Sequence, residues 1–253
     1  LTDEGEKIIG SIDIILNELD AIRNSNSPNE YISGDVYVEA SPTICSTIMP
    51  QIIIACKQAY PGINVYVKET FTDKSITDLL AGLSTISITS YVGMDQLQSL
   101  QRNLSARNFV AEQLLTEKFV LYVGKDCPLS SEAAVKLEEA YAYPWIILQE
   151  NSYEENCVIM GDDEMCPNSI IAFQDKDSVK QAISVNLGVA VLPSSFAGEN
   201  DPYVTAGLIH RIALTDVELD TMHVLMTPKK RKFTTVEKCF LDELHKFYQN
   251  LAE

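Results

Sequence analysis

The chain has 253 residues, a charged fraction of 22% and a formal net charge of −17 at pH 7. This charge excludes the polypeptide itself as a holder of nucleic acid, because phosphates are neutralised by clustered Lys and Arg. The hydrophobic fraction of 46% suffices for a real core, yet no run of about 20 uncharged apolar residues could span a bilayer. We therefore expect a globular protein of one or two lobes without a membrane partner.

The amino-terminal 27 residues read as a helix with one apolar stripe. Apolar residues recur at alternating steps of four and three, which is the heptad seam of a helix that packs against a partner. A polar segment at 25–29, Ser-Asn-Ser-Pro-Asn, ends it. We predict a linker and dimerisation helix over residues 1–27, and packing against its own domain is the open alternative. The seam includes Ile8, Ile12, Ile15, Leu19 and Ile22.

Residues 36–67 predict a βαβ unit: an apolar strand, a Ser-Pro-Thr turn, an amphipathic helix and a second apolar strand. A right-handed crossover makes the strands parallel, so Ser41 and Thr43 lie at the carboxyl end of the first strand, where open α/β sheets bind ligands. Free N–H groups at the helix start favour an anion or another hydrogen-bonding ligand. An ordinary capped crossover helix is the alternative.

Strands and helices go on alternating to the end of the chain. We predict an α/β fold of two lobes, with a hinge where the chain crosses between them twice. Residues 33–112 and 214–253 form the first lobe, and residues 113–213 form the second. The predicted elements are helices at 44–59, 76–81, 131–140, 177–186 and 235–250, and strands at 86–89, 119–123, 145–148, 170–173, 189–192, 208–214 and 222–226.

Catalytic motifs are not found in the sequence. It has no phosphate-binding loop, nucleophile elbow or paired-His motif. His210, His223 and His245 have no nucleophile or carboxylate at a useful spacing, and we assign them to the surface or to packing. We predict no metal site, no cofactor and no enzyme. Six scattered cysteines and the lack of a leader-like start favour a cytoplasmic protein.

Five short motifs carry a family resemblance, to the LysR-type transcriptional regulators. Residues 1–5 resemble the Leu-Thr-x-x-Gly that opens that family's linker helix, and 49–50 with 60–62 resemble its Leu-Pro followed by a Tyr/His-Pro pair. Residues 125–129 are similar to its Asp-His-Pro-Leu, and 186–193 to its Gly-Leu-Gly-Ile-Ala-Leu-Leu-Pro. Each motif is weak alone, but their order and spacing are specific and cover nearly the whole chain.

The resemblance implies a periplasmic-binding-protein-like (type 2) effector domain with an amino-terminal linker helix. Its implied partners are a small-molecule effector between the lobes, further copies of the chain in a dimer or tetramer, and DNA. DNA would be bound only through a winged helix-turn-helix that this sequence does not include, which accounts for the acidic charge. Residues 82–86 stand where the family has Gly-x-Leu-Asp-Leu, so the shape of that loop is left open.

The resemblance also implies site residues. Aligned on Pro50 and Glu69, Thr43 and Thr72 match positions that line the family's effector cleft. Seven further positions are implied. The first lies beside Thr43, two end the strand at which the lobes cross, two follow a strand of the second lobe, and two precede a helix that starts at the cleft. Turn or cap roles are the alternative for each, and no Arg is assignable to the cleft. These positions are Ser41, Thr89, Ser90, Asn151, Ser152, Asp175 and Asp177.

Two other functional classes stay open. The same fold serves the solute-binding receptors of transporters, although the heptad helix and the lack of a signal weigh against that reading. A thiol-based redox regulator is the other, because Cys157 and Cys166 are nine residues apart, as in peroxide-sensing LysR members. Asn156 stands where those members commonly have His, and the neighbouring Glu154 and Glu155 would raise a thiol pKa, so structural cysteines remain the alternative.

Overall fold

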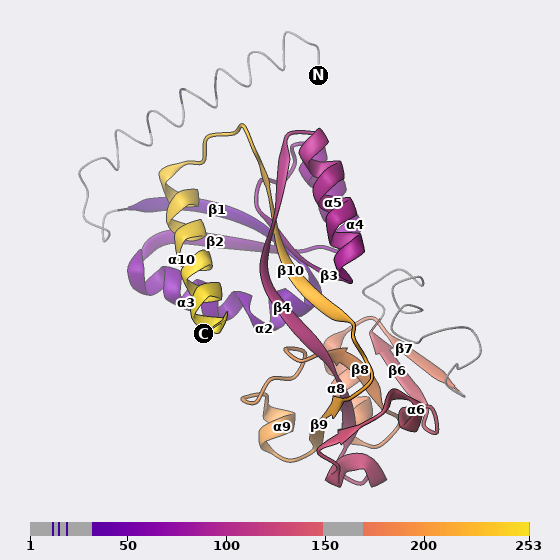
Figure 1. The fold of residues 1–253 in the computed structure, drawn as a ribbon. Helices are drawn as coiled ribbons and strands as arrows, with labels where there is room; N and C mark the ends of the chain where they lie inside the picture. The colour runs from indigo at the N-terminus through magenta and orange to yellow at the C-terminus, as the bar shows by residue number, and fades with distance from the viewer. Residues whose placement is uncertain (1–11, 13–14, 16–18, 20–31, 149–168, 253) are drawn as a thin grey trace.

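The computed structural model describes residues 32–148 and 169–252, together with Ile12, Ile15 and Leu19. It is a two-lobed α/β fold, in which strands β4 (Phe109–Gly124) and β10 (Asp220–Pro228) run from one lobe toward the other (Figure 1). Ile12, Ile15 and Leu19 are helical, and about half of each side chain is exposed. Several predicted residues lie outside the described part, namely Ile8, Ile22, Asn151, Ser152, Cys157 and Cys166.

The first lobe is a sheet with helices on both faces (Figure 1). The core between the sheet and helices α3 and α10 includes Ile52 and Phe240, neither of which is exposed, and the core beneath α4 and α5 includes Leu79 and Leu97. Strands β1, β2 and β3 are parallel, whereas β10 runs antiparallel between β3 and β4. The elements are β1 (Ser33–Ala40), α2 (Pro42–Thr47), α3 (Met49–Ala59), β2 (Gly62–Glu69), α4 (Thr72–Leu80), β3 (Ser87–Val92), α5 (Met94–Ala106), β4 (Phe109–Gly124), β10 (Asp220–Pro228) and α10 (Thr235–Ala252).

Two sequence-based predictions for this lobe need correction, and one helix was missed. The expected helix at 44–59 is two helices, α2 and α3, because Pro50 has no N–H to continue the first one. Strand β3 does not end at Thr89 and Ser90 but continues to Val92, because β10 pairs with it along that length. Helix α5 was not expected, although its leucines at 97, 100 and 104 follow a helical spacing.

In the second lobe, helix α8 packs against the far end of an eight-stranded sheet, which continues from the first lobe through β4, and against a separate two-stranded sheet of β6 and β7. The predicted helix at 131–140 is wrong: this segment holds the end of a 3-10 helix, a short strand and a short helix, because Ala134 and Val135 pair with β9 instead of continuing a helix. The elements are η2 (Pro128–Ser131), β5 (Ala134–Val135), α6 (Leu137–Ala140), β6 (Trp145–Leu148), β7 (Ile170–Phe173), α8 (Lys176–Ser184), β8 (Ala190–Pro193), α9 (Pro202–Thr205) and β9 (Ile209–Leu214).

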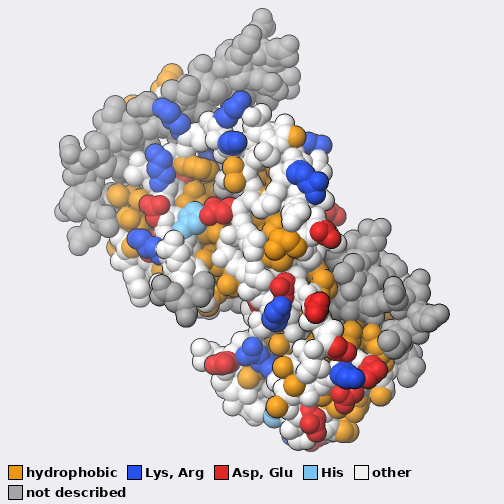
Figure 2. Space-filling view, viewed as in Figure 1, with side chains coloured by type: hydrophobic (Ala, Val, Ile, Leu, Met, Phe, Trp, Pro, Cys, Tyr) orange, Lys and Arg blue, Asp and Glu red, His pale blue; other side chains and the backbone are white. Residues whose placement is uncertain are grey.

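The two lobes meet at a narrow waist (Figure 2), where β4 and β10 lie side by side (Figure 1). Strand β4 pairs with β10 as far as Lys118 and with β8 from Phe119 onward. The register of the β4–β10 pair shifts between His223 and Val224, which is a bulge at the waist. Because β4 crosses without interruption, the lobe boundaries at residues 112–113 and 213–214 remain predictions. None of the described helices is long and apolar enough to cross a membrane.

Candidate functional site

Three of the predicted site residues meet where β1 and β2 end, beside the middle of β3. The Ser41 amide donates to the carbonyl of Ile88 at 3.0 Å, beside Thr89, and the hydroxyls of Thr72 and Thr89 share a hydrogen bond. Ser41 and Thr89 are buried, and Thr72 is half-buried. We call Ser41, Thr72 and Thr89 the hydroxyl edge. Thr43 is buried in the first turn of α2, directly beyond it.

Ser41 does not act as the helix cap that its position suggests. It is the N-cap residue of α2, yet its side chain makes no capping hydrogen bond. Its Oγ is buried and has no hydrogen-bond partner among the described residues. A buried hydroxyl without a partner is costly, so this atom is suited to bind a polar group that enters the edge.

The remaining predicted residues take other places. Ser90 is half-buried in the middle of β3, opposite His223 of β10. Asp175 is the N-cap of α8, where its carboxylate accepts a hydrogen bond from the Ser178 amide at 2.7 Å. The hydrogen bonds from Ser178 lower the pKa of Asp175, as expected for a capping carboxylate. Asp177 lies in the same first turn and is exposed.

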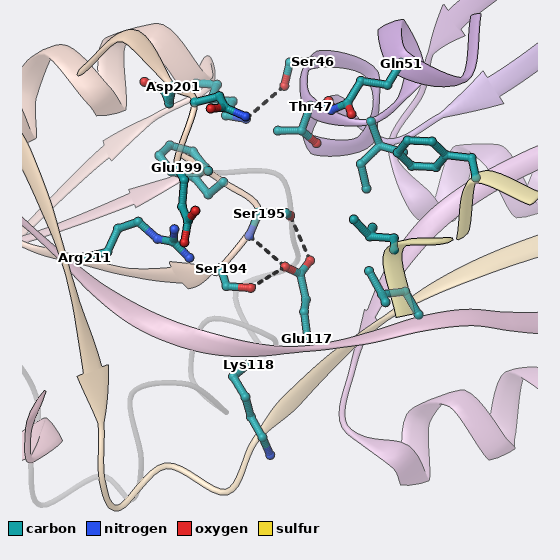
Figure 3. A pocket seen from close by; sticks show the side chains of 18 of the residues that line it. Ser46, Thr47, Gln51, Glu117, Lys118, Ser194, Ser195, Glu199, Asp201 and Arg211 are labelled. Atoms are coloured by element: carbon teal, nitrogen blue, oxygen red, sulfur yellow. Dashed lines mark hydrogen bonds between the residues drawn. The ribbon is translucent and has the colours of Figure 1, made fainter. Parts of the chain in front are cut away.

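A pocket of about 690 Å³ lies between the lobes and is lined by both of them (Figure 3). We call it the interlobe pocket. The first lobe contributes the ends of α2 and α10 and the start of α3, the second contributes α8, β9 and the turn after β8, and β4 forms the floor. The first-lobe wall is uncharged and mixes polar with apolar side chains, and the second-lobe wall carries most of the charge. Representative residues are Ile48, Phe247 and Leu251 on the first wall and Lys176, Glu199 and Arg211 on the second.

The cations of the interlobe pocket differ in how they are held. Lys180 is ion-paired with Asp201 and is largely buried. Lys176 reaches across to the first lobe, where its Nζ donates to Ser46 Oγ at 3.3 Å, and it also lies 4.9 Å from the centre of the Phe196 ring. Arg211 is half-buried, and its Nε is buried with no hydrogen-bond partner among the described residues. Arg211 and Lys176 therefore present donors to this space from two sides of the second lobe.

Glu117 on β4 carries the most heavily bonded carboxylate described at the pocket. It accepts four hydrogen bonds: from Ser194 Oγ at 2.9 Å, from Ser195 N and Oγ at 2.8 and 2.9 Å, and from His223 Nε2 at 2.8 Å. Figure 3 shows both serines pointing at Glu117, while Lys118 points away from them. Burial alone would raise the pKa of Glu117, but His223 and the Ser195 hydrogen bonds outweigh it, so that the pKa lies below its usual value. Glu117 is therefore ionised.

The hydrogen bonds continue into the first lobe. His223 has no exposed surface, and its Nδ1 lies 3.1 Å from the hydroxyl of Tyr248 on α10. We call Ser194, Ser195, Glu117, His223 and Tyr248 the Glu117 network. The burial of His223 fits its assignment to the surface or to packing, but the sequence spacing gave no sign of its carboxylate partner, which the pairing of β10 with β4 brings beside it. His245 likewise contacts Glu112 of β4, at 3.1 Å.

Sequence reasoning missed the charged wall of the interlobe pocket. It found no Arg for the cleft, yet Arg211 lines this pocket from β9. The only available signal was the position of Lys176 between the predicted Asp175 and Asp177, at the start of a helix. Arg211 and Glu117 lie in strands with no local motif, so only the sheet topology could have found them. Among the described residues, no group of three or more His, Cys, Asp or Glu side chains could hold a metal ion.

Comparison with known proteins agrees with this architecture. Residues 29–249 match the family model described as the LysR substrate binding domain. A protein named probable RuBisCO transcriptional regulator from Thalassiosira pseudonana is 27% identical over 172 residues, which are 64% of this chain and 52% of that protein. The HTH-type transcriptional regulator CysL of Bacillus subtilis is 18% identical over 218 residues, 85% of this chain and 64% of that protein. The chain spans about half the length of the first three curated relatives.

Solved structures share the fold. The effector binding domain of QuiR, in complex with shikimate, has a TM-score of 0.65 and 14% identity, and the match covers 86% of this chain and 98% of that one. HinK, a LysR family transcriptional regulator from Pseudomonas aeruginosa, has a TM-score of 0.69 and 15% identity, with 99% of this chain and 82% of that one covered. Since the family model spans both lobes and the fold agrees, this chain belongs to the LysR substrate-binding domain family.

Proposed function

We propose that this chain is the effector-sensing part of a LysR-type transcriptional regulator and binds a small molecule in the interlobe pocket. The observation that carries the proposal is the shared lining of that pocket, in which Lys176 of the second lobe reaches Ser46 of the first. A ligand that contacts both lobes favours one lobe arrangement over another, and this difference in affinity is what a sensor needs. The role is sensing, and we assign no catalytic step to it.

The lining of the interlobe pocket offers apolar surface on one lobe and hydrogen-bond donors on the other. Ile48, Phe247 and Leu251 offer apolar surface on the first lobe, while Arg211 and Lys176 offer donors on the second. Ser194 and Ser195 already donate to Glu117, so they serve as a wall that Glu117 holds in place. The hydroxyl edge lies at the start of α2, one helix length from Ser46, and we propose it as an extension of the same site. The buried Ser41 Oγ, which has no hydrogen-bond partner among the described residues, supports that extension.

The whole protein requires partners beyond this chain. We propose that it acts as a dimer or tetramer through the amino-terminal helix and contacts DNA through the family's amino-terminal domain. The charge of −17 agrees with DNA contact lying outside these residues. We also propose a cytoplasmic location, where such a regulator meets DNA.

The proposal is tested by a thermal-shift screen of small metabolites against the parent and Arg211→Gln. A pocket ligand should raise the Tm of the parent, and Arg211→Gln should weaken its binding by at least about tenfold, since a charge-assisted hydrogen bond contributes about 1.5–3 kcal/mol. Lys125→Gln, which changes an exposed cation on the turn after β4, should leave binding intact. Compounds that stabilise parent and Arg211→Gln equally would place the effector elsewhere.

A further inference from the structure

We propose that Glu117 is a positioning residue that couples the wall of the interlobe pocket to the C-terminal helix of the first lobe. Its carboxylate is the only described group that bonds both to the Ser194–Ser195 turn of the second lobe and to His223, which bonds Tyr248 of α10. The part this plays in sensing rests on the proposed function. The coupling itself needs no ligand, so the two can fail separately.

The hydrogen-bond inventory of Glu117 is full. An ionised carboxylate only accepts, and it has room for about four donors. His223 and Ser195 Oγ occupy Oε1, while Ser194 Oγ and Ser195 N occupy Oε2. Loss or movement of the Ser195 hydroxyl in the second lobe therefore changes the hydrogen bonding of Oε1, the oxygen that His223 also uses.

The position of Glu117 makes this a contact between lobes. It lies one residue before Lys118, the last β4 residue paired with β10, and two residues before Phe119, the first paired with β8. The β10 residue opposite Glu117 is Thr221, and the register shift between His223 and Val224 begins two residues further along β10. Tyr122 of β4 holds the same turn independently, since its hydroxyl donates to the backbone there and accepts from the Ala197 amide. The turn thus keeps a second anchor if Glu117 is changed.

Glu117 also sets the proton position on His223. Because the carboxylate cannot donate, His223 Nε2 must carry the proton that bridges them. In the neutral imidazole Nδ1 is then bare and accepts the hydroxyl proton of Tyr248. A Gln at position 117 has one acceptor oxygen. If that oxygen serves the Ser195 amide, its NH2 faces His223, Nε2 must become the acceptor, and the proton moves to Nδ1.

The test reads the proton positions directly by long-range proton–nitrogen NMR of the imidazoles, in which a protonated and a bare ring nitrogen give distinct shifts. The chain has only three histidines, so assignment is tractable. The parent should show His223 protonated at Nε2, and Glu117→Gln should show it protonated at Nδ1. Glu112→Gln is the matched control, because Glu112 lies on the same strand and contacts His245, and it should leave His223 unchanged. An unchanged His223 tautomer in Glu117→Gln would overturn the proposal.

Coupling across the waist is tested from both ends with milder variants, which also serve if Glu117→Gln does not fold. Ser195→Ala in the second lobe should shift the His223 ring signals. Tyr248→Phe in the first lobe should speed hydrogen exchange of the Ser195 amide by about fivefold, the effect of one hydrogen bond. Tyr60→Phe is the control, because Tyr60 lies beside Cys239, which is on the same helix as Tyr248. This change should leave the exchange rate of the Ser195 amide unaltered. If neither variant has an effect in the other lobe, Glu117 merely caps the turn and the proposal is wrong.

Discussion

Glu117 is a buried carboxylate held by donors from two lobes, and its stability contribution follows from its pKa. Its folded pKa is depressed, so the stabilisation is complete above the unfolded value of about 4.3 and is lost as the pH falls through the folded value. Glu117→Gln should therefore lower the unfolding free energy at neutral pH by about 1–3 kcal/mol, because buried donors lose their acceptor.

The same variant should respond less to acid than the parent. Urea unfolding between about pH 6 and about pH 3 should show the parent losing stability more steeply, so that the gap to Glu117→Gln narrows at low pH. Glu112→Gln, on the exposed part of β4, should keep the steep dependence. A constant gap across this range would mean that Glu117 does not change its protonation on unfolding.

The hydrogen bond between Thr72 and Thr89 gives a second stability prediction at the residue scale. Its hydroxyl bonds that of Thr89, which is 1% exposed. Thr72→Val should cost about 1–3 kcal/mol of unfolding free energy, because the Thr89 hydroxyl is left buried without this partner. Thr72→Ser retains the hydroxyl and should lie closer to the parent in chemical denaturation. Equal stability of Thr72→Val and the parent would show that Thr89 finds another partner.

At the scale of elements, the βαβ unit at the amino end of the first lobe could be predicted because its signals are local. The apolar run of β1, the Pro of α2 and the Tyr-Pro-Gly stop after α3 all lie within one segment. The break between α2 and α3 also has a local cause in Pro50, but the amphipathic spacing across it reads as one helix. The short β5 could not be predicted, because it exists only through its pairing with β9.

Helix α8 tests whether Asp175 serves as a cap or as a ligand contact. Its side chain accepts from the Ser178 amide, so Asp175→Ala should lower the Tm by a few degrees, whereas Asp175→Asn, which also caps, should nearly preserve it. Thermal unfolding followed by circular dichroism gives the comparison. If Asn lowers the Tm as much as Ala does, the negative charge matters more than the capping hydrogen bond.

The site at the scale of the whole molecule was less predictable than the fold. Hydroxyl residues at strand ends are visible in the sequence, and Ser41, Thr72 and Thr89 do meet. Arg211, Glu117 and His223 were not found, because each lies in a strand without a local motif and acquires its neighbours from strand pairings over long separations. Glu117 and His223, for example, are 106 positions apart.

Self-association through the amino-terminal helix is also a property of the whole molecule. Ile12 and Leu19 are helical and about half exposed, as a seam awaiting a second copy would be. Replacing both by Asp should raise the dimer dissociation constant at least about tenfold in sedimentation equilibrium, because buried unpaired carboxylates are costly. Val185→Asp, at an exposed apolar site of the second lobe, is the control. Dimers unaffected by the double change would place the interface on the lobes.

The central claim is that a small molecule binds between the lobes, and a crystal structure with a compound from the thermal-shift screen tests it most directly. The account predicts ligand density in the interlobe pocket, within hydrogen-bond distance of Arg211 or Lys176 and against the apolar side chain of Phe247. Density that touches one lobe only, or lies outside both the interlobe pocket and the hydroxyl edge, would contradict it.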